Sequence, residues 1–194
     1  MTEQRAEQLA KETLSPKRLQ HTLNVRDVAV ELAKQYGADV HKAAVAALLH
    51  DIAKEMTKEE MLQIFSHNAI MACDAPQKPF PVWHGFCAAI LAKVKWGVED
   101  EEILSAIRCH TTGKPGMTLL DKIIFLADMT SAERNYPEVE YLRKLERQDI
   151  HLAMRTAMEM NIQWLQQSGK PVDETSLQTL EDLRHNQNKG DLVL

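Results

Sequence analysis

Histidine and aspartate residues recur over about half of this chain, each inside or at the edge of an apolar stretch with helical periodicity. The set consists of His21, the adjacent pair His50-Asp51, His84, His110 and Asp128. Burying neutral imidazoles beside carboxylates is costly unless a cation binds them. Six such groups distributed over five predicted helices therefore indicate one metal site inside a helical bundle, and a metal-dependent hydrolase rather than a purely structural helical domain.

Size and composition fit a single all-α domain over residues 1–194. The chain has 194 residues, enough for a sizeable core, and its hydrophobic content of 44% is ordinary for a soluble globular protein. Only 7 Gly and 7 Pro are present, too few for a linker-rich or all-β chain. Nearly every periodic segment is helical, so we expect a core over about 15–168, followed by a C-terminal helix and tail.

Charge, apolar run length and cysteine content exclude several classes of protein. The formal net charge of -5 argues against a nucleic-acid-binding protein, although bound metal could still attract a phosphate-bearing substrate. No apolar run approaches the roughly 20 residues of a membrane span, and the charged N-terminus lacks the apolar region of a signal peptide. Cys73, Cys87 and Cys109 lack C-x-x-C spacing and predict reduced thiols in a cytoplasmic protein.

Local start and stop signals place the candidate ligands on predicted helices. Ser15-Pro16 starts the helix that carries His21, and Gly37 ends it. Asp39 caps the next helix, which is apolar on almost every side through His50-Asp51 and should be the central helix. Other helices are expected to follow Thr57, to cover 84–97, 100–110, 119–129, 149–167 and 175–184, and to leave an irregular loop over 67–82.

The His50-Asp51 pair is the part of the set that is hardest to explain without a ligand. Adjacent side chains on a helix point about 100° apart, so both can address one metal, or one can bridge two metals. An apolar helix has no inexpensive way to satisfy both groups, and Lys54 follows on the same face. The remaining histidines lie in polar surroundings and are expected at the surface.

The order H…HD…H…H…D resembles the HD-domain superfamily of metal-dependent phosphohydrolases. The segments KRLQHTLNV, LLHDIAKEM, HGFCAAILA, AIRCHTTGKPGMTLLDKIIFLAD and SAERNYP narrow this resemblance to the bacterial HD-domain symmetrical bis(5'-nucleosyl)-tetraphosphatases. The resemblance extends from about Leu14 to about Trp164 and implies an HD-domain helical bundle with a dinuclear metal site. It implies a first metal held by His21, His50, Asp51 and Asp128, and a second held by His84 and His110, with Asp51 bridging.

The same resemblance implies the reaction and the cofactor. This family cleaves dinucleoside tetraphosphates, such as diadenosine tetraphosphate, symmetrically into two nucleoside diphosphates, with iron as the reported metal. A set of histidines and carboxylates with open positions suits iron or manganese, and spacing alone does not select between them. We therefore expect two divalent ions, iron being the first candidate and manganese the alternative.

A polyphosphate substrate also needs fixed cations and hydrogen-bond donors. The candidates are Arg18, His21, Lys54, Thr112, Gly113 and Arg134 for phosphate binding, and Asp51, Lys54 and Arg134 for catalysis. Arg18 lies one helical turn before His21, and backbone N–H groups around Gly113 could donate to phosphate oxygens. For Arg18 and Arg134, a solvated or ion-paired side chain is the alternative interpretation.

Two other functions stay open on the sequence. One is another HD phosphohydrolase that acts on nucleoside mono- or triphosphates, and the HTTG and Glu-Arg segments favour the tetraphosphatase over it. The other is a non-catalytic nucleotide-binding HD protein, which would be expected to lack a ligand, whereas all six are present. The sequence leaves open the base preference, the physiological role of the nucleotide and whether the chain forms a homodimer.

Overall fold

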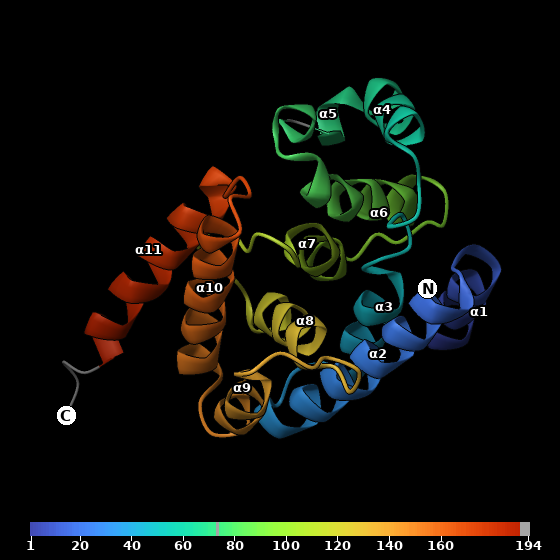
Figure 1. The fold of residues 1–194 in the computed structure, drawn as a ribbon. Helices are drawn as coiled ribbons and strands as arrows, with labels where there is room; N and C mark the ends of the chain where they lie inside the picture. The colour runs from blue at the N-terminus through green and yellow to red at the C-terminus, as the bar shows by residue number, and fades with distance from the viewer. Residues whose placement is uncertain (73, 191–194) are drawn as a thin grey trace.

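The computed structural model describes residues 1–72 and 74–190, and its regular structure there is entirely helical, as predicted (Figure 1). The elements are α1 (Glu3–Thr13), α2 (Pro16–Tyr36), α3 (Val40–Leu49), α4 (Lys58–His67), α5 (Ala69–Ala72), η1 (Ala75–Gln77), η2 (Phe80–Val82), α6 (Trp83–Val94), α7 (Glu101–Cys109), α8 (Leu119–Thr130), α9 (Val139–Glu146), α10 (Ile150–Gln167) and α11 (Glu174–Gly190). Residues 73 and 191–194, including Cys73, lie outside the described residues.

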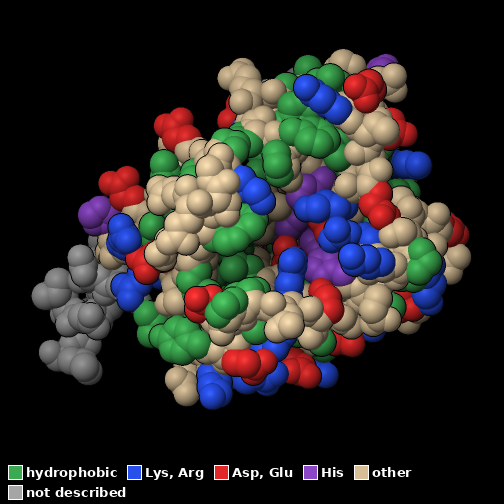
Figure 2. Space-filling model, in the orientation of Figure 1, with side chains coloured by type: hydrophobic (Ala, Val, Ile, Leu, Met, Phe, Trp, Pro, Cys, Tyr) green, Lys and Arg blue, Asp and Glu red, His purple; other side chains and the backbone are tan. Residues whose placement is uncertain are grey.

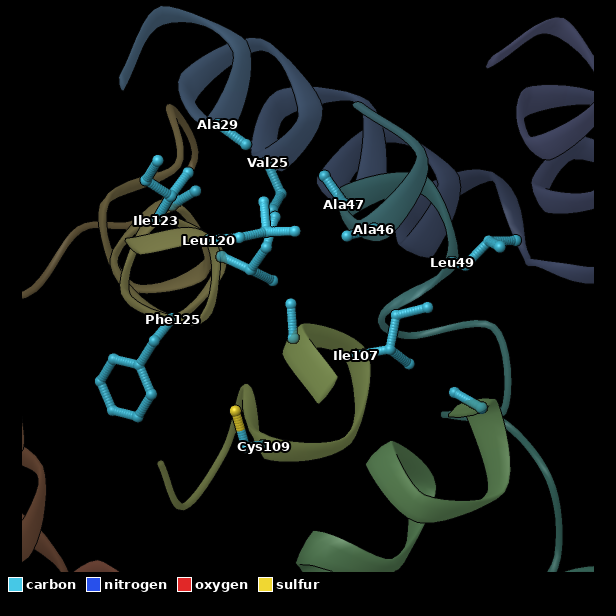
Figure 3. Packing of buried hydrophobic residues seen from close by; sticks show 14 of the residues in the cluster. Val25, Ala29, Ala46, Ala47, Leu49, Ile107, Cys109, Leu120, Ile123 and Phe125 are labelled. Carbon is cyan, nitrogen blue, oxygen red and sulfur yellow. The ribbon is translucent and has the colours of Figure 1, made fainter. Parts of the chain in front are cut away.

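Helix α3 is the central helix, as its nearly continuous apolar sequence predicts. Every residue from Ala43 to Leu49 is buried, and the helix packs against α1, α2, α7 and α8. Figure 3 shows side chains of α2, α7 and α8, among them Val25 and Ile107, gathered around those of α3. A helix that is apolar on every side needs neighbours on every side, so this packing brings the ends of several helices to one place.

The predicted helix caps are present in the structure. The Ser15 side chain accepts from the backbone N–H of Arg18, with Pro16 in the first helical turn, and Gly37 ends α2 in the left-handed conformation with φ 71°. Capping boxes start α4 at Thr57 and α8 at Thr118. The local signals at Ser15 and Thr118 therefore set the starts of α2 and α8, on which His21 and Asp128 lie.

The structure corrects the expected boundaries at several places. Helices α1 and α9 were not predicted, because α1 is highly charged and buries only a narrow apolar stripe, while α9 is short. The expected irregular loop over 67–82 contains α5, η1 and η2, with prolines in the first turns of η1 and η2, where a missing N–H is tolerated. Helix α11 continues past Arg184 to Gly190.

The second correction concerns His50-Asp51, which lie just beyond α3 rather than within it. His50 is the C-cap of α3, and tight turns follow, in which the N–H of Ile52 donates to the carbonyl of Leu49 and that of Lys54 to Asp51. Bonds over three residues wind the chain more tightly than an α-helix does. The His-Asp pair is consequently placed where α3 ends, among the neighbouring helices.

The described cysteines are free and buried. Burial raises the pKa of the Cys87 thiol to about 12 and also raises that of Cys109. Both thiols are therefore protonated near neutral pH. Among the described residues, no helix combines the length and the apolar character that crossing a membrane would need.

Glu146 in α9 makes folding stability depend on pH. It is only 2% exposed, and burial raises its pKa from 4.5 to about 7. Because the folded state holds this proton more tightly than the unfolded state, stability is lost as the pH rises from about 4.5 through 7. We expect Glu146→Gln to raise the free energy of unfolding by about 1–3 kcal/mol at pH 8, and by much less at pH 5.

Urea unfolding at the two pH values measures this difference. Glu138→Gln, at an exposed acid without a side-chain cap bond, is the matched control and should change stability little at either pH. An equal effect of Glu146→Gln at pH 5 and pH 8 would show that the buried carboxyl does not titrate in this range.

Candidate metal centre

The six predicted ligands lie together at the point where α2, α3, α6, α7 and α8 meet. His21 comes from the first half of α2, His84 from the first turn of α6, and Asp128 from α8, while the other three end or follow α3 and α7. The four histidines and Asp51 are buried, and the Asp128 side chain is 19% exposed. Packing around α3 thus assembles groups that are up to about half the chain apart in sequence.

The Asp51 carboxylate lies at the centre of this cluster and separates the four rings into two pairs. Its Oδ1 is 3.1 Å from Nε2 of His84 and 3.6 Å from Nε2 of His110. Its Oδ2 is 3.6 Å from Nε2 of both His21 and His50. Asp128 adds a carboxylate on the second side, with Oδ1 3.1 Å from Nε2 of His21. This is the arrangement expected of a carboxylate that bridges two positions.

Every ring is oriented through its other nitrogen. The Nδ1 atoms of His50, His84 and His110 lie 2.6–2.8 Å from the backbone carbonyls of Ala47, Pro81 and Ile107. The Nδ1 of His21 instead contacts the Glu133 carboxylate. Since these partners can only accept, the bonding pattern assigns a proton to each Nδ1 and leaves the Nε2 lone pairs directed at the centre.

The nitrogen and oxygen acceptors at the centre of the cluster outnumber the hydrogen-bond donors that could satisfy them. Nε2 of His84 and Nε2 of His110 are 3.0 Å apart, although neither can donate in the tautomer that Nδ1 requires. Nε2 of His21, Nε2 of His50 and Oδ1 of Asp51 are buried and make no hydrogen bond within residues 1–72 and 74–190. Buried acceptors without donors are rare in proteins, so the donor set fits a divalent metal cation.

Protonation states also suit metal ligands. Burial lowers the pKa of both His50 and His84 to about 4, which keeps these rings neutral near pH 7. Burial alone would raise the pKa of Asp51, but the electrostatic influence of the surrounding imidazoles, His50 first, holds it well below its usual range. Ligands must be neutral imidazoles and ionised carboxylates, and these groups already meet that condition.

His21 differs from the other rings, because carboxylates surround it. Burial on its own lowers the pKa of His21, yet the neighbouring carboxylates of Asp128 and Glu133 outweigh burial and raise it. The pKa of Asp128 is lowered in return, since His21 and Arg134 overcome the effect of burial. The His21 side of the cluster is thus the more anionic side.

Three cationic side chains lie at the edge of the cluster. Arg18 donates to Oδ2 of Asp51 at 2.8 Å, and Lys54 Nζ is 3.1 Å from Nε2 of His84. Arg134 donates through Nε to the carbonyl of Asp128 and forms an ion pair with the Asp128 carboxylate. About a third of each of these side chains is exposed, and Figure 2 shows histidines at the bottom of a hollow bordered by Lys and Arg.

Thr112 and Gly113 do not join this cluster. The Thr112 hydroxyl is buried and donates to the carbonyl of Gly113, whose own N–H donates to Cys109. Both residues line a cavity of about 500 Å³ that is bordered by α6, α7 and α11, and none of the six ligands lines it. The Thr112 hydroxyl and the Gly113 N–H are therefore used within the turn that ends α7, and phosphate binding by this loop stays a prediction.

Sequence reasoning missed Glu133 and the residues that hold it. Its carboxylate accepts hydrogen bonds from Ser131 at 2.7 Å and Asn24 at 2.5 Å, in addition to its contact with His21. Burial would raise the pKa of Glu133, but these bonds lower it to about 2. Glu133 stands next to the predicted Arg134, and only that position hinted at a role, because His21 is 112 residues away.

Comparisons with known proteins agree with this geometry. The HD domain family model matches residues 18–133, which include all six clustered side chains. The "Bis(5'-nucleosyl)-tetraphosphatase, symmetrical" of Bacillus subtilis (strain 168) is 40% identical over 172 residues, covering 89% of this chain and 92% of that protein. The protein of the same name from Halalkalibacterium halodurans is 38% identical over 183 residues, covering 94% and 97%.

A solved structure has the same fold over nearly its whole length. It is the crystal structure of a predicted HD superfamily hydrolase involved in NAD metabolism from Clostridium acetobutylicum. The TM-score is 0.90 and the sequence identity 32%, and the match covers 96% of this chain and 98% of that one.

Proposed function

Because this chain belongs to the HD-domain family, among the symmetrical bis(5'-nucleosyl)-tetraphosphatases, we propose that it hydrolyses dinucleoside tetraphosphates to two nucleoside diphosphates. Diadenosine tetraphosphate is the substrate we expect first. The relatives' activity supports this reaction, and the buried His/Asp cluster supplies a place for the divalent metal that it needs. The observation that carries the proposal is the Asp51 carboxylate with one histidine pair on each oxygen.

We propose that the cluster holds two divalent ions. The first would be bound by His21, His50, Asp51 and Asp128, and the second by His84, His110 and Asp51. Asp51 would bridge them through its two oxygens. Iron is the first candidate and manganese the alternative, since both accept a mixture of imidazole and carboxylate.

The bound ions would make a water molecule a nucleophile near neutral pH and stabilise charge on the attacking and leaving oxygens. The chain's own residues would do the rest. Arg18, Lys54 and Arg134 lie at the rim, where fixed positive charges can bind and orient the polyphosphate. Arg18 and Arg134 pair with the Asp51 and Asp128 carboxylates, so each guanidinium lies beside a proposed metal position.

The position of the cut follows from which half of the substrate is recognised. If the protein holds one nucleoside diphosphate half and places its terminal phosphate over the cluster, the bond that breaks is the central one. Recognition shifted by one phosphate would give unequal products instead. The product mixture therefore reports the register of the polyphosphate chain directly.

A product analysis tests the proposal. Metal-loaded protein incubated with diadenosine tetraphosphate should yield ADP alone, and in water labelled with heavy oxygen one label should enter per pair of ADP molecules. AMP with ATP would contradict central cleavage. Faster phosphate release from a nucleoside monophosphate would favour another HD phosphohydrolase, and binding without any turnover would favour the non-catalytic alternative.

The location and assembly of the protein stay predictions. The free, protonated thiols of Cys87 and Cys109 support a cytoplasmic location, because an oxidising compartment favours disulfides. A homodimer is compatible with the proposed chemistry but is not required by it, since all six proposed ligands come from one chain.

A further inference from the structure

One of the four clustered histidines is oriented differently from the other three. His50, His84 and His110 each direct Nδ1 at a neutral backbone carbonyl. His21 directs Nδ1 at the carboxylate of Glu133. The pair of rings on one oxygen of Asp51 therefore includes a ring with an anionic partner, whereas the pair on the other oxygen does not.

Glu133 is itself held in place by three donors. Its Oε1 accepts from the hydroxyl of Ser131 as well as from His21, and its Oε2 accepts from the amide of Asn24. Asn24 lies on α2 one turn after His21, so one helix carries both the His21 ring and a donor that holds the Glu133 carboxylate in place. Ser131, the second donor, is fully buried, so its side chain is fixed as well. The side chain of Glu133 is 38% exposed, yet its orientation is fixed at both oxygens.

An anionic acceptor on one imidazole nitrogen changes what the other nitrogen can do. It fixes the tautomer and the plane of the ring, and it raises the basicity of the nitrogen that faces the metal. A neutral carbonyl fixes the tautomer but contributes less to basicity. The difference should appear as a difference in metal affinity between the two halves of the cluster.

We propose that Glu133 is a positioning residue that makes the His21 and His50 metal position the tighter of the two. This inference rests on the proposed dinuclear centre and states which of its two positions binds metal more tightly. Glu133 would act through the His21 ring and not by contact with substrate. The His84 and His110 position, oriented by backbone alone, would be the weaker one, filled last and lost first.

Metal titration of two variants tests this inference without reference to catalysis. Metal-free protein is titrated with Mn²⁺. Two dissociation constants are obtained from calorimetry and from the electron paramagnetic resonance signal of free Mn²⁺. Glu133→Ala should weaken the tighter constant about 10–100-fold and leave the weaker one nearly unchanged. Glu133→Gln should fall between, since the amide oxygen can still accept from His21 but carries no charge.

Glu138→Ala is the matched control, because this exposed acid follows in the same segment and its side chain caps nothing. It should bind Mn²⁺ as the natural protein does. Two sites of equal affinity in the natural protein, equal weakening of both sites in Glu133→Ala, or an unchanged tighter site would each overturn the inference. If Glu133→Ala does not fold, the nearly isosteric Glu133→Gln decides the question in the same assay.

The titration also separates this inference from the proposed function. Selective weakening of the tighter site in a protein that leaves diadenosine tetraphosphate intact would support the role of Glu133 and reject the substrate. Production of ADP with no change of either Mn²⁺ dissociation constant in the variants would support the substrate and reject the role of Glu133.

Discussion

Replacing Asp51 by alanine is expected to remove both metal ions and to reduce hydrolysis of diadenosine tetraphosphate below detection. The reason is geometric: Oδ1 lies with His84 and His110, and Oδ2 lies with His21 and His50. One truncation therefore takes a ligand from each position. Changes in residues that merely orient ligands cost about 10–100-fold, so loss of a shared ligand should exceed that.

Elemental analysis of purified Asp51→Ala, together with circular dichroism, measures this outcome. Asp27→Ala, at an exposed aspartate of α2, is the control and should retain both the metal and the activity. Asp51→Asn adds a sharper test, because its single carbonyl oxygen can serve only one position well. Full metal occupancy in a folded Asp51→Ala protein would reject the bridging assignment.

The sequence was sufficient to single out the six side chains that lie together in the structure, for a physical reason. Each is a polar group in or beside an apolar helix, and such a group needs a partner wherever the helix is buried. His50 and Asp51 at the end of α3 are the strongest case, since the residues before them are buried on every side of that helix. Helix caps such as Ser15 and Thr118 were equally visible, because capping depends on residues within one turn.

Contacts between distant segments were not visible in the sequence. Glu133 contacts His21 across 112 residues, and no local pattern announces a partner at that distance. The internal hydrogen bonds of Thr112 and Gly113 were also not visible, because the sequence does not show that these donors close the end of α7. Helix α9 lacked a clear start signal, as the Glu138 cap makes no side-chain bond.

The sequence likewise did not decide whether Arg18 and Arg134 form ion pairs. Arg18 and Arg134 each had an ion-paired alternative, and in this structure each contacts a carboxylate of the cluster. Those contacts place both guanidinium groups beside the proposed metal positions. A variant that separates turnover from metal content tests whether either one also binds phosphate.

Arg134→Ala is the variant that makes this separation, and it is expected to lower turnover about 10–1000-fold while both metals stay bound. A guanidinium carries five N–H donors. The contacts with Asp128 use the Nε donor and one on Nη2, and 39% of the side chain is exposed at the rim. The remaining donors can therefore reach a phosphate oxygen while Asp128 stays in place.

Steady-state kinetics with diadenosine tetraphosphate, and metal content from the same preparations, measure the effect. Arg134→Lys should recover part of the lost turnover, because it restores the charge without the two-pronged geometry that suits phosphate. Arg184→Ala, at an exposed ion pair on α11, is the control and should match the natural protein. Unchanged kinetics in Arg134→Ala would limit this residue to its ion pair. Loss of metal in step with turnover would instead mean that Arg134 acts by holding Asp128, because only a residue directed at the substrate can lower the rate of a fully loaded centre.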